Sequence, residues 1–209
     1  MRRSSCTVVL LAALAAAGPL AADDWPHWRG PTRDGHTAEG SGWTGGEWLS
    51  ADPAWAKEVG AGASSPLVFR GRVYVHGYEP KEDVVRCLAL ADGREEWARR
   101  TPAPRHGRFH KGEEHMYGGP SATPELDTDT GLLYTLGIDG DLRCWDPADR
   151  GRPVWAVNLT DAYGVTQRPM LTKVYHRDYG YTAAPSSTAT GSSSRSAPRA
   201  RAPTSRSTR

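Results

Sequence analysis

Histidines and glutamates gather in one polar stretch of this sequence, HGRFHKGEEH over residues 106–115. His106, His110 and His115 stand four and five residues apart, with Glu113 and Glu114 before the last of them. Imidazole and carboxylate groups are ligands of zinc and iron, so a metal site is one interpretation. Glycines interrupt the stretch, however, and no helical pattern holds these side chains at a fixed spacing. We favour a solvated loop, and we predict neither a metal site nor a catalytic residue here.

Two cysteines offer a different chemistry. Cys87 and Cys144 could form a disulfide bond in an oxidising compartment. They stand, however, at equivalent positions of two sequence repeats described below. Equivalent points of neighbouring repeats should lie beyond the roughly 7 Å Cα separation that a disulfide allows. We therefore predict two buried free thiols.

The first 22 residues have the pattern of an export signal. Arg2 and Arg3 precede an uncharged apolar run, residues 7–17, and small residues then lead to Asp23. The run is shorter than the roughly 20 apolar residues that a membrane-spanning helix needs. A buried N-terminal helix is the alternative. We predict an exported protein, periplasmic or extracellular, whose mature chain begins at or near Asp23, where no Cys is present to carry a lipid anchor.

The last 24 residues, 186–209, contain only Ser, Arg, Thr, Ala, Pro and Gly. Such a segment has no apolar side chains to bury, so its ordering entropy would not be repaid and we expect disorder. The composition changes abruptly inside what looks like a third repeat. We therefore favour the product of a shifted reading frame over a genuine disordered tail.

Charge separates the two ends from the middle of the chain. The whole sequence carries 26 basic and 24 acidic side chains. Seven of the basic residues, all arginines, lie in segments 1–22 and 186–209, which hold no acidic residue, so residues 23–185 have a net charge of −5. A mildly acidic folded part argues against nucleic acid as a partner.

Residues 64–97 and 121–155 are two copies of one pattern, and such self-similarity is typical of repeat folds. Five anchor positions match in order, separated by 57 to 60 residues: Pro66 with Pro124, Tyr74 with Tyr134, Gly77 with Gly137, Cys87 with Cys144, and Trp97 with Trp155. A third copy opens at residues 181–185.

Each copy divides into four short β-type segments, and four antiparallel strands per repeat are typical of a propeller blade. A β-sandwich is the competing interpretation, but a sandwich does not place a Trp at the same point of each unit. We predict an all-β fold over residues 55–185, preceded by an N-terminal segment at 23–54. The fold would be an incomplete β-propeller of four-stranded antiparallel Trp-ended blades, about two blades plus the start of a third.

The ends of the two copies, CLALADGREEW (87–97) and CWDPADRGRPVW (144–155), are similar to those of quinoprotein-type, or pyrroloquinoline-quinone-like, β-propeller repeats. The chain resembles this family from about Asp24 to Pro185. The opening WPHWRGPTRDG (25–35) also resembles the start of secreted bacterial proteins with these repeats. The resemblance implies that the Trp ring packs between neighbouring blades. Ala89 departs from the family pattern, which has Asp there, whereas Asp146 keeps it.

The same resemblance makes Trp55, Trp97 and Trp155 the structural blade tryptophans. No three strands precede Trp55, so we expect it in the outer strand of a final blade, which the N-terminal strand of a propeller commonly completes. Closed propellers have at least four blades. We therefore expect a two-blade chain to leave an apolar face open at each end.

Segments 115–124 and 176–185 are alike: each has a His, then a Tyr-Gly pair, before the first strand of a repeat. That strand lines the central channel of a propeller, so His115, Tyr117, His176 and Tyr179 are candidate channel-facing residues. Alternatively, Tyr-Gly only turns the chain into the strand.

The sequence contains no P-loop, dinucleotide-binding or Ser-His-Asp pattern. It also lacks the Cys-Cys pair and acidic ligand set that quinone-dependent dehydrogenases of the resembled type carry. Only the family resemblance suggests pyrroloquinoline quinone as a cofactor, and we predict no cofactor. We predict a non-enzymatic binding or scaffold module for a protein or extracellular ligand, without a stable membrane anchor. The alternatives are the N-terminal part of a quinone-dependent oxidoreductase and a scaffold like the propeller lipoprotein of the outer-membrane barrel-assembly machinery.

Overall fold

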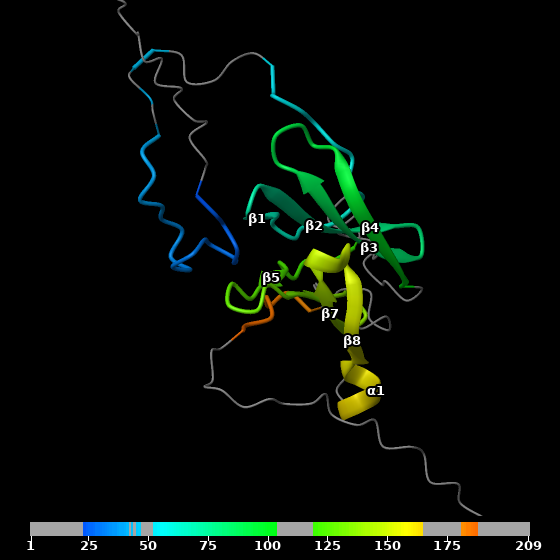
Figure 1. Ribbon diagram of the computed structural model, residues 1–209. Coiled ribbons are helices and arrows are strands. Elements are labelled where there is room, and N and C mark those ends of the chain that lie inside the picture. Colours follow the sequence, from blue (N-terminus) through cyan, green and yellow to red (C-terminus); the bar gives the residue numbers. More distant parts are fainter. Residues whose placement is uncertain are drawn as a thin grey trace, which may run out of the picture.

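The computed structural model describes residues 23–41, 43, 45–46, 52–103, 119–164 and 181–187. Its regular structure is almost entirely β (Figure 1), so the all-β prediction is confirmed. The first sheet has the strand order β1 (Leu67–Phe69), β2 (Arg72–Glu79), β3 (Glu82–Ala89), β4 (Glu95–Pro102). The second has the order β5 (Glu125–Leu126), β6 (Leu133–Leu136), β7 (Asp141–Asp146), β8 (Arg152–Asn158).

Both sheets are antiparallel meanders. The helical segments among the described residues are a 3₁₀ turn, η1 (Pro147–Asp149), and a short helix, α1 (Leu159–Tyr163). Within the described part of the chain, no helix is long and apolar enough to span a membrane.

The two sheets repeat the same register. One row of Cα partners crosses the first sheet through Leu67, Tyr74, Cys87 and Trp97, and the matching row of the second runs through Glu125, Tyr134, Cys144 and Trp155. The register shifts immediately after the Cys in both sheets. The Tyr and Trp rings also pack alike, at 6.2 Å and 48° in the first sheet and 6.0 Å and 49° in the second. The sequence repeat is therefore a structural repeat.

One detail of the prediction is wrong, because Trp97 does not end its strand. It is the third residue of β4, which continues to Pro102. The continuation follows from the length of β3, whose Val84 and Val85 pair with Arg100 and Arg99. Trp155 likewise lies inside β8.

The first sheet packs against the second through one hydrophobic core. Leu67, Phe69, Tyr74, Val85, Cys87 and Trp97 of the first sheet meet Leu126, Leu133 and Trp145 of the second. The Trp145 indole N–H donates to Thr135 Oγ1 over 2.9 Å, so its one polar group is satisfied inside this core.

Cys87 and Cys144 are both free and fully buried, as predicted. Burial raises the pKa of the Cys87 thiol to about 12 and that of Cys144 to about 11. Because the thiolate is the reactive form, both thiols should be inert in the folded protein. We expect N-ethylmaleimide at pH 6.5 to leave both unmodified over minutes in the native chain and to label both in denaturant, as read by peptide mass spectrometry. Rapid native labelling of either, or a missing thiol in denaturant, would contradict this.

Candidate functional site

All four candidate channel-facing residues, His115, Tyr117, His176 and Tyr179, lie outside the described residues. The same holds for the His- and Glu-rich stretch at 106–115. The strand that follows segment 115–124, β5, is described, however, and it leads to a polar site.

Each Trp of the series that is followed by a described sheet packs on a glycine of that sheet. The Trp55 ring lies against Gly93, in the turn between β3 and β4, and its indole N–H donates to the Leu90 carbonyl over 2.9 Å. Trp97 lies in the same way against Gly151, in the turn between β7 and β8. A Cβ at Gly151 would stand 2.6 Å from the Trp97 ring, and its φ of +71° is itself strained for other residues.

The two contacts differ in one respect. The Trp97 indole nitrogen has no hydrogen-bond partner among the described residues. The segment from Cys144 to Trp155 has one more residue than the segment from Cys87 to Trp97, and its turn forms η1.

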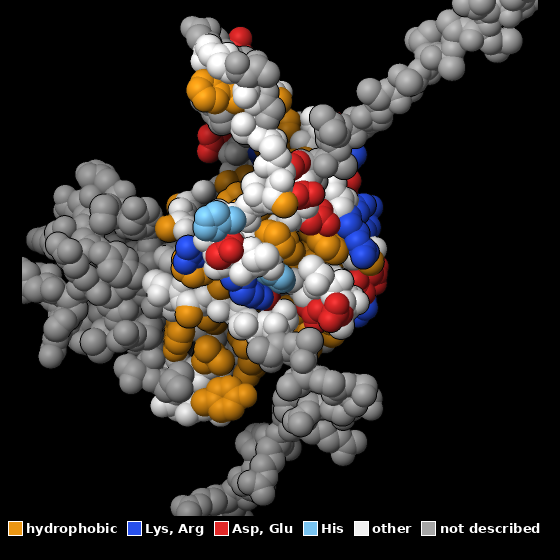
Figure 2. Space-filling view, turned by 90° about the vertical axis from the view of Figure 1, so that its left-hand side faces the viewer, with side chains coloured by type: hydrophobic (Ala, Val, Ile, Leu, Met, Phe, Trp, Pro, Cys, Tyr) orange, Lys and Arg blue, Asp and Glu red, His pale blue; other side chains and the backbone are white. Residues whose placement is uncertain are grey.

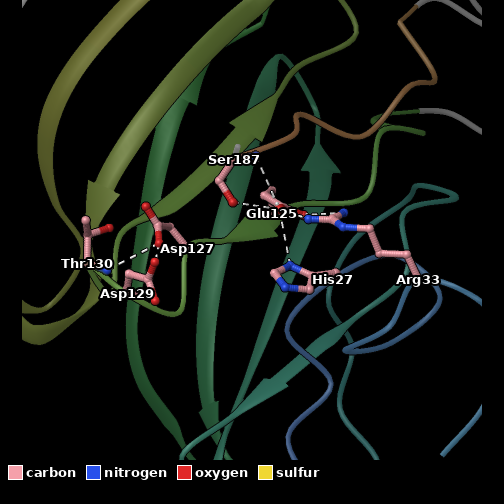
Figure 3. Close-up of polar contacts among 7 residues, drawn as sticks. All are labelled: His27, Arg33, Glu125, Asp127, Asp129, Thr130 and Ser187. Atoms are coloured by element: carbon pink, nitrogen blue, oxygen red, sulfur yellow. Dashed lines mark hydrogen bonds and ion pairs between the residues drawn. The ribbon is translucent and has the colours of Figure 1, made fainter. Parts of the chain in front are cut away.

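A buried carboxylate, Glu125, joins three distant parts of the chain (Figure 3). Its oxygens accept hydrogen bonds from both terminal nitrogens of Arg33, one of them over 3.2 Å. Ser187 donates to Oε1 from its hydroxyl over 2.9 Å and from its backbone N–H over 3.3 Å. His27 Nδ1 lies 3.2 Å from the same oxygen, although not aligned for a hydrogen bond. We call these four residues the Glu125 junction.

Backbone contacts hold the N-terminal segment at this junction. Trp25 pairs with Val68 of β1 through two hydrogen bonds, of 2.7 and 3.0 Å. The next carbonyl, that of Pro26, accepts from Leu126 N of β5 over 3.2 Å. The segment therefore bridges the first strands of both sheets, and this bridge places His27 and Arg33 beside Glu125.

A local turn sets the direction of β5. Asp127 follows β5, and its Oδ1 accepts from the backbone N–H groups of Asp129 and Thr130 over 2.9 and 3.3 Å (Figure 3). Such Asx turns stabilise tight connections. The chain thus reverses directly into β6, with Glu125 opposite Tyr134.

The sequence interpretation did not include any residue of the Glu125 junction. A signal was available, because Glu125 stands at the position that Leu67 holds in the first repeat. A charged residue at a position expected to be buried needs a partner. The partners lie 92 and 62 residues away, at Arg33 and Ser187, and no spacing rule connects them.

The chemistry of this junction is electrostatic. Both oxygens of Glu125 already accept from a guanidinium, and one also accepts from Ser187. A general base needs a lone pair directed at a substrate proton. Glu125 is instead a buried charge that is paired and hydrogen-bonded, the arrangement that makes burial of a charge tolerable.

A pocket of about 540 Å³ lies beside the junction. Tyr134, Leu136, Leu142 and Trp155 of the second sheet line it, together with Asp127 and residues 183–187. Burial, and then the neighbouring Cys144, raise the pKa of the Tyr134 phenol to about 12, so that it is neutral at any ordinary pH. The pocket therefore offers a mainly apolar, aromatic surface.

No protein-family model matches this chain, and a comparison with curated proteins gives no match.

Proposed function

We propose that this chain is an exported β-propeller repeat module that binds another protein or an extracellular ligand and does not catalyse a reaction. The observation that carries the proposal is the contact repeated from one unit to the next: Trp55 packs on Gly93, and Trp97 packs on Gly151. This contact lets similar sheets be added in series, which is the principle of a propeller.

The Glu125 junction supports binding over catalysis. The hydrogen bonds of its polar groups join the N-terminal segment, the second sheet and residue 187. Next to it, Trp28 stays 52% exposed while its neighbour His27 is turned inward. Exposed Trp side chains are enriched where proteins bind partners, because one side chain supplies a large contact area.

Charge supports a partner other than nucleic acid. Residues 23–185 carry a net charge of −5. Figure 2 shows acidic and basic side chains intermingled on the described part of one face, beside a gathering of hydrophobic ones. A polyanion would be repelled by such a net charge.

Site-specific photo-crosslinking tests the proposed surface. We expect benzophenone at position 28 to give a discrete adduct in the producing cells, with the adduct outside the cytoplasm. Benzophenone at Val154, 43% exposed on the edge strand β8, should give none. Equal adducts at both positions, or none at position 28, would count against this surface.

A ligand titration separates binding from redox catalysis. The full chain is titrated with pyrroloquinoline quinone and Ca²⁺, and reduction of an artificial electron acceptor is followed with alcohols and aldoses. We expect neither saturable quinone binding nor turnover. Turnover that depends on the quinone would replace our proposal with the oxidoreductase alternative.

A further inference from the structure

Five ionisable side chains meet where the two sheets pack together. His76 of β2 and Asp83 of β3 come from the first sheet, and Asp139, Asp141 and Arg143 come from β7 and the turn before it. His76, Asp83 and Asp139 are 3%, 4% and 5% exposed. Buried charges are costly unless they are compensated, so this interface must balance its charge.

Asp83 is the group that lies across the interface. Its Oδ2 is 3.9 Å from His76 Nε2 on its own sheet. The same oxygen lies against Gly137 of the second sheet, so close that a Cβ at this position would collide with it. Asp83 Oδ1 and His76 Nδ1 have no hydrogen-bond partner among the described residues.

Among the described residues that face Asp83, the one guanidinium, that of Arg143, already faces another carboxylate. The Arg143 guanidinium lies 3.8 Å from Asp141 Oδ1, so it pairs with Asp141 rather than with Asp83. Residues 61–63 and 119–123, which pack beside the carbonyl of His76 and near Gly62, contribute no ionisable side chain. One proton bound to Asp83 would neutralise the carboxyl that has no cation of its own among these residues.

The pKa shifts agree with this geometry. Burial, followed by the charges of Asp139 and Asp141, raises the pKa of the Asp83 carboxyl to about 7, against the opposing effect of Arg143. Burial, and then Arg143, lower the pKa of His76 to about 3. The imidazole is therefore neutral near pH 7, and the proton belongs to Asp83.

We propose that Asp83 is the proton-binding site of a latch between the two sheets, which closes when the carboxyl is protonated and loosens when it ionises. Ionisation would leave an uncompensated carboxylate pressed against the Gly137 backbone and facing Asp139 and Asp141. Because Asp83 of the first sheet lies against Gly137 of the second, the charge acts directly on the packing of the two sheets. This inference is independent of the proposed binding function.

The two buried groups affect stability in opposite directions. Asp83 has a raised pKa, so its contribution is complete below the ordinary value of 3.8 and is lost as the pH rises through about 7. His76 has a lowered pKa, so its contribution is complete above 6.5 and is lost as the pH falls towards about 3. The two largely cancel between pH 5 and 7, and the wild-type profile alone cannot isolate Asp83.

A comparison of the wild type with Asp83→Asn isolates the contribution of Asp83 to stability. The quantity compared is the ratio of the two folding equilibrium constants, wild type divided by variant. With Asp83 titrating near pH 7, the ratio should fall roughly thirtyfold between pH 5.5 and 8.5 in urea unfolding, since the His76 contribution is common to both proteins. Glu82→Gln is the matched control. Glu82 precedes Asp83 on β3, and its side chain is 42% exposed, so its ratio should stay constant. A constant ratio for Asp83→Asn would overturn the proposal.

A second readout tests the latch itself. Cys87 lies in the core shared by the two sheets, whereas Cys144 lies outside it. The slow native labelling rate of Cys87 relative to Cys144 should rise from pH 5.5 to 8.5 in the wild type and stay level in Asp83→Asn. A level ratio in both proteins would exclude the latch. If the variant does not fold, carboxyl NMR of the wild type decides, because titration of Asp83 below pH 5 would also overturn the proposal.

Discussion

Trp97→Ala is expected to lower the free energy of unfolding by about 3–5 kcal/mol, the cost typical of removing a buried large aromatic side chain. The Trp97 ring is 6% exposed, and it contacts Tyr74 of its own sheet and Gly151 of the next. Its removal would therefore open a cavity between the two sheets. Urea unfolding followed by circular dichroism measures the loss.

Two further variants make this prediction specific. Trp43→Ala is the matched control, because the Trp43 side chain is 55% exposed, and its cost should stay within about 0.5 kcal/mol. Gly151→Ala should destabilise the protein from the other side of the contact. It adds a Cβ under the Trp97 ring at a φ of +71°, where the left-handed conformation alone costs about 1–2 kcal/mol. Equal costs for Trp97→Ala and Trp43→Ala would refute the docking role.

Glu125→Ala should cost about 3 kcal/mol, the lower end of the range for breaking a buried ion pair, because water can reach the partly exposed Arg33. The variant leaves Arg33 without its carboxylate and releases Ser187. The contacts of residues 27–33 and 187 with the second sheet should therefore weaken. Hydrogen exchange at Leu126, whose N–H donates to Pro26, reports this directly.

A double-mutant cycle tests whether Glu125 and Arg33 stabilise the protein as a pair. Glu125→Leu restores the residue type of Leu67, and combined with Arg33→Met it removes both charges at once. Replacing both partners of a buried pair is often close to neutral, so we expect the double variant to be more stable than Glu125→Leu alone. Glu96→Gln is the control. It breaks the Arg72–Glu96 pair at the surface, with an N–O distance of 2.7 Å, and should cost no more than about 1 kcal/mol. A double variant that is less stable than Glu125→Leu would contradict this prediction.

Most of the secondary structure could be predicted from the local periodicity of the sequence. Short β-type segments predicted the strands of each unit, and the matched spacing of Tyr, Cys and Trp predicted that the two units are equivalent. Such patterns are visible because strands alternate their faces every second residue and hairpins join neighbours in the chain. The same logic predicted two buried, unpaired cysteines. The strand ends were less well predicted, because β4 extends past Trp97 only as far as its partner β3 allows.

The polar sites depended on tertiary structure. Glu125 is an unusual residue in its repeat, but the sequence does not say that Arg33 and Ser187 compensate its charge, because these contacts span 92 and 62 residues. Asp83 looks like an ordinary hairpin residue until Gly137 and Asp139 of the second sheet are placed against it. The sequence by itself thus determined the strands and the repeat, which are local and periodic. Only the packing of one sheet on the next decided which charges are buried together, because that depends on contacts with no fixed spacing along the chain.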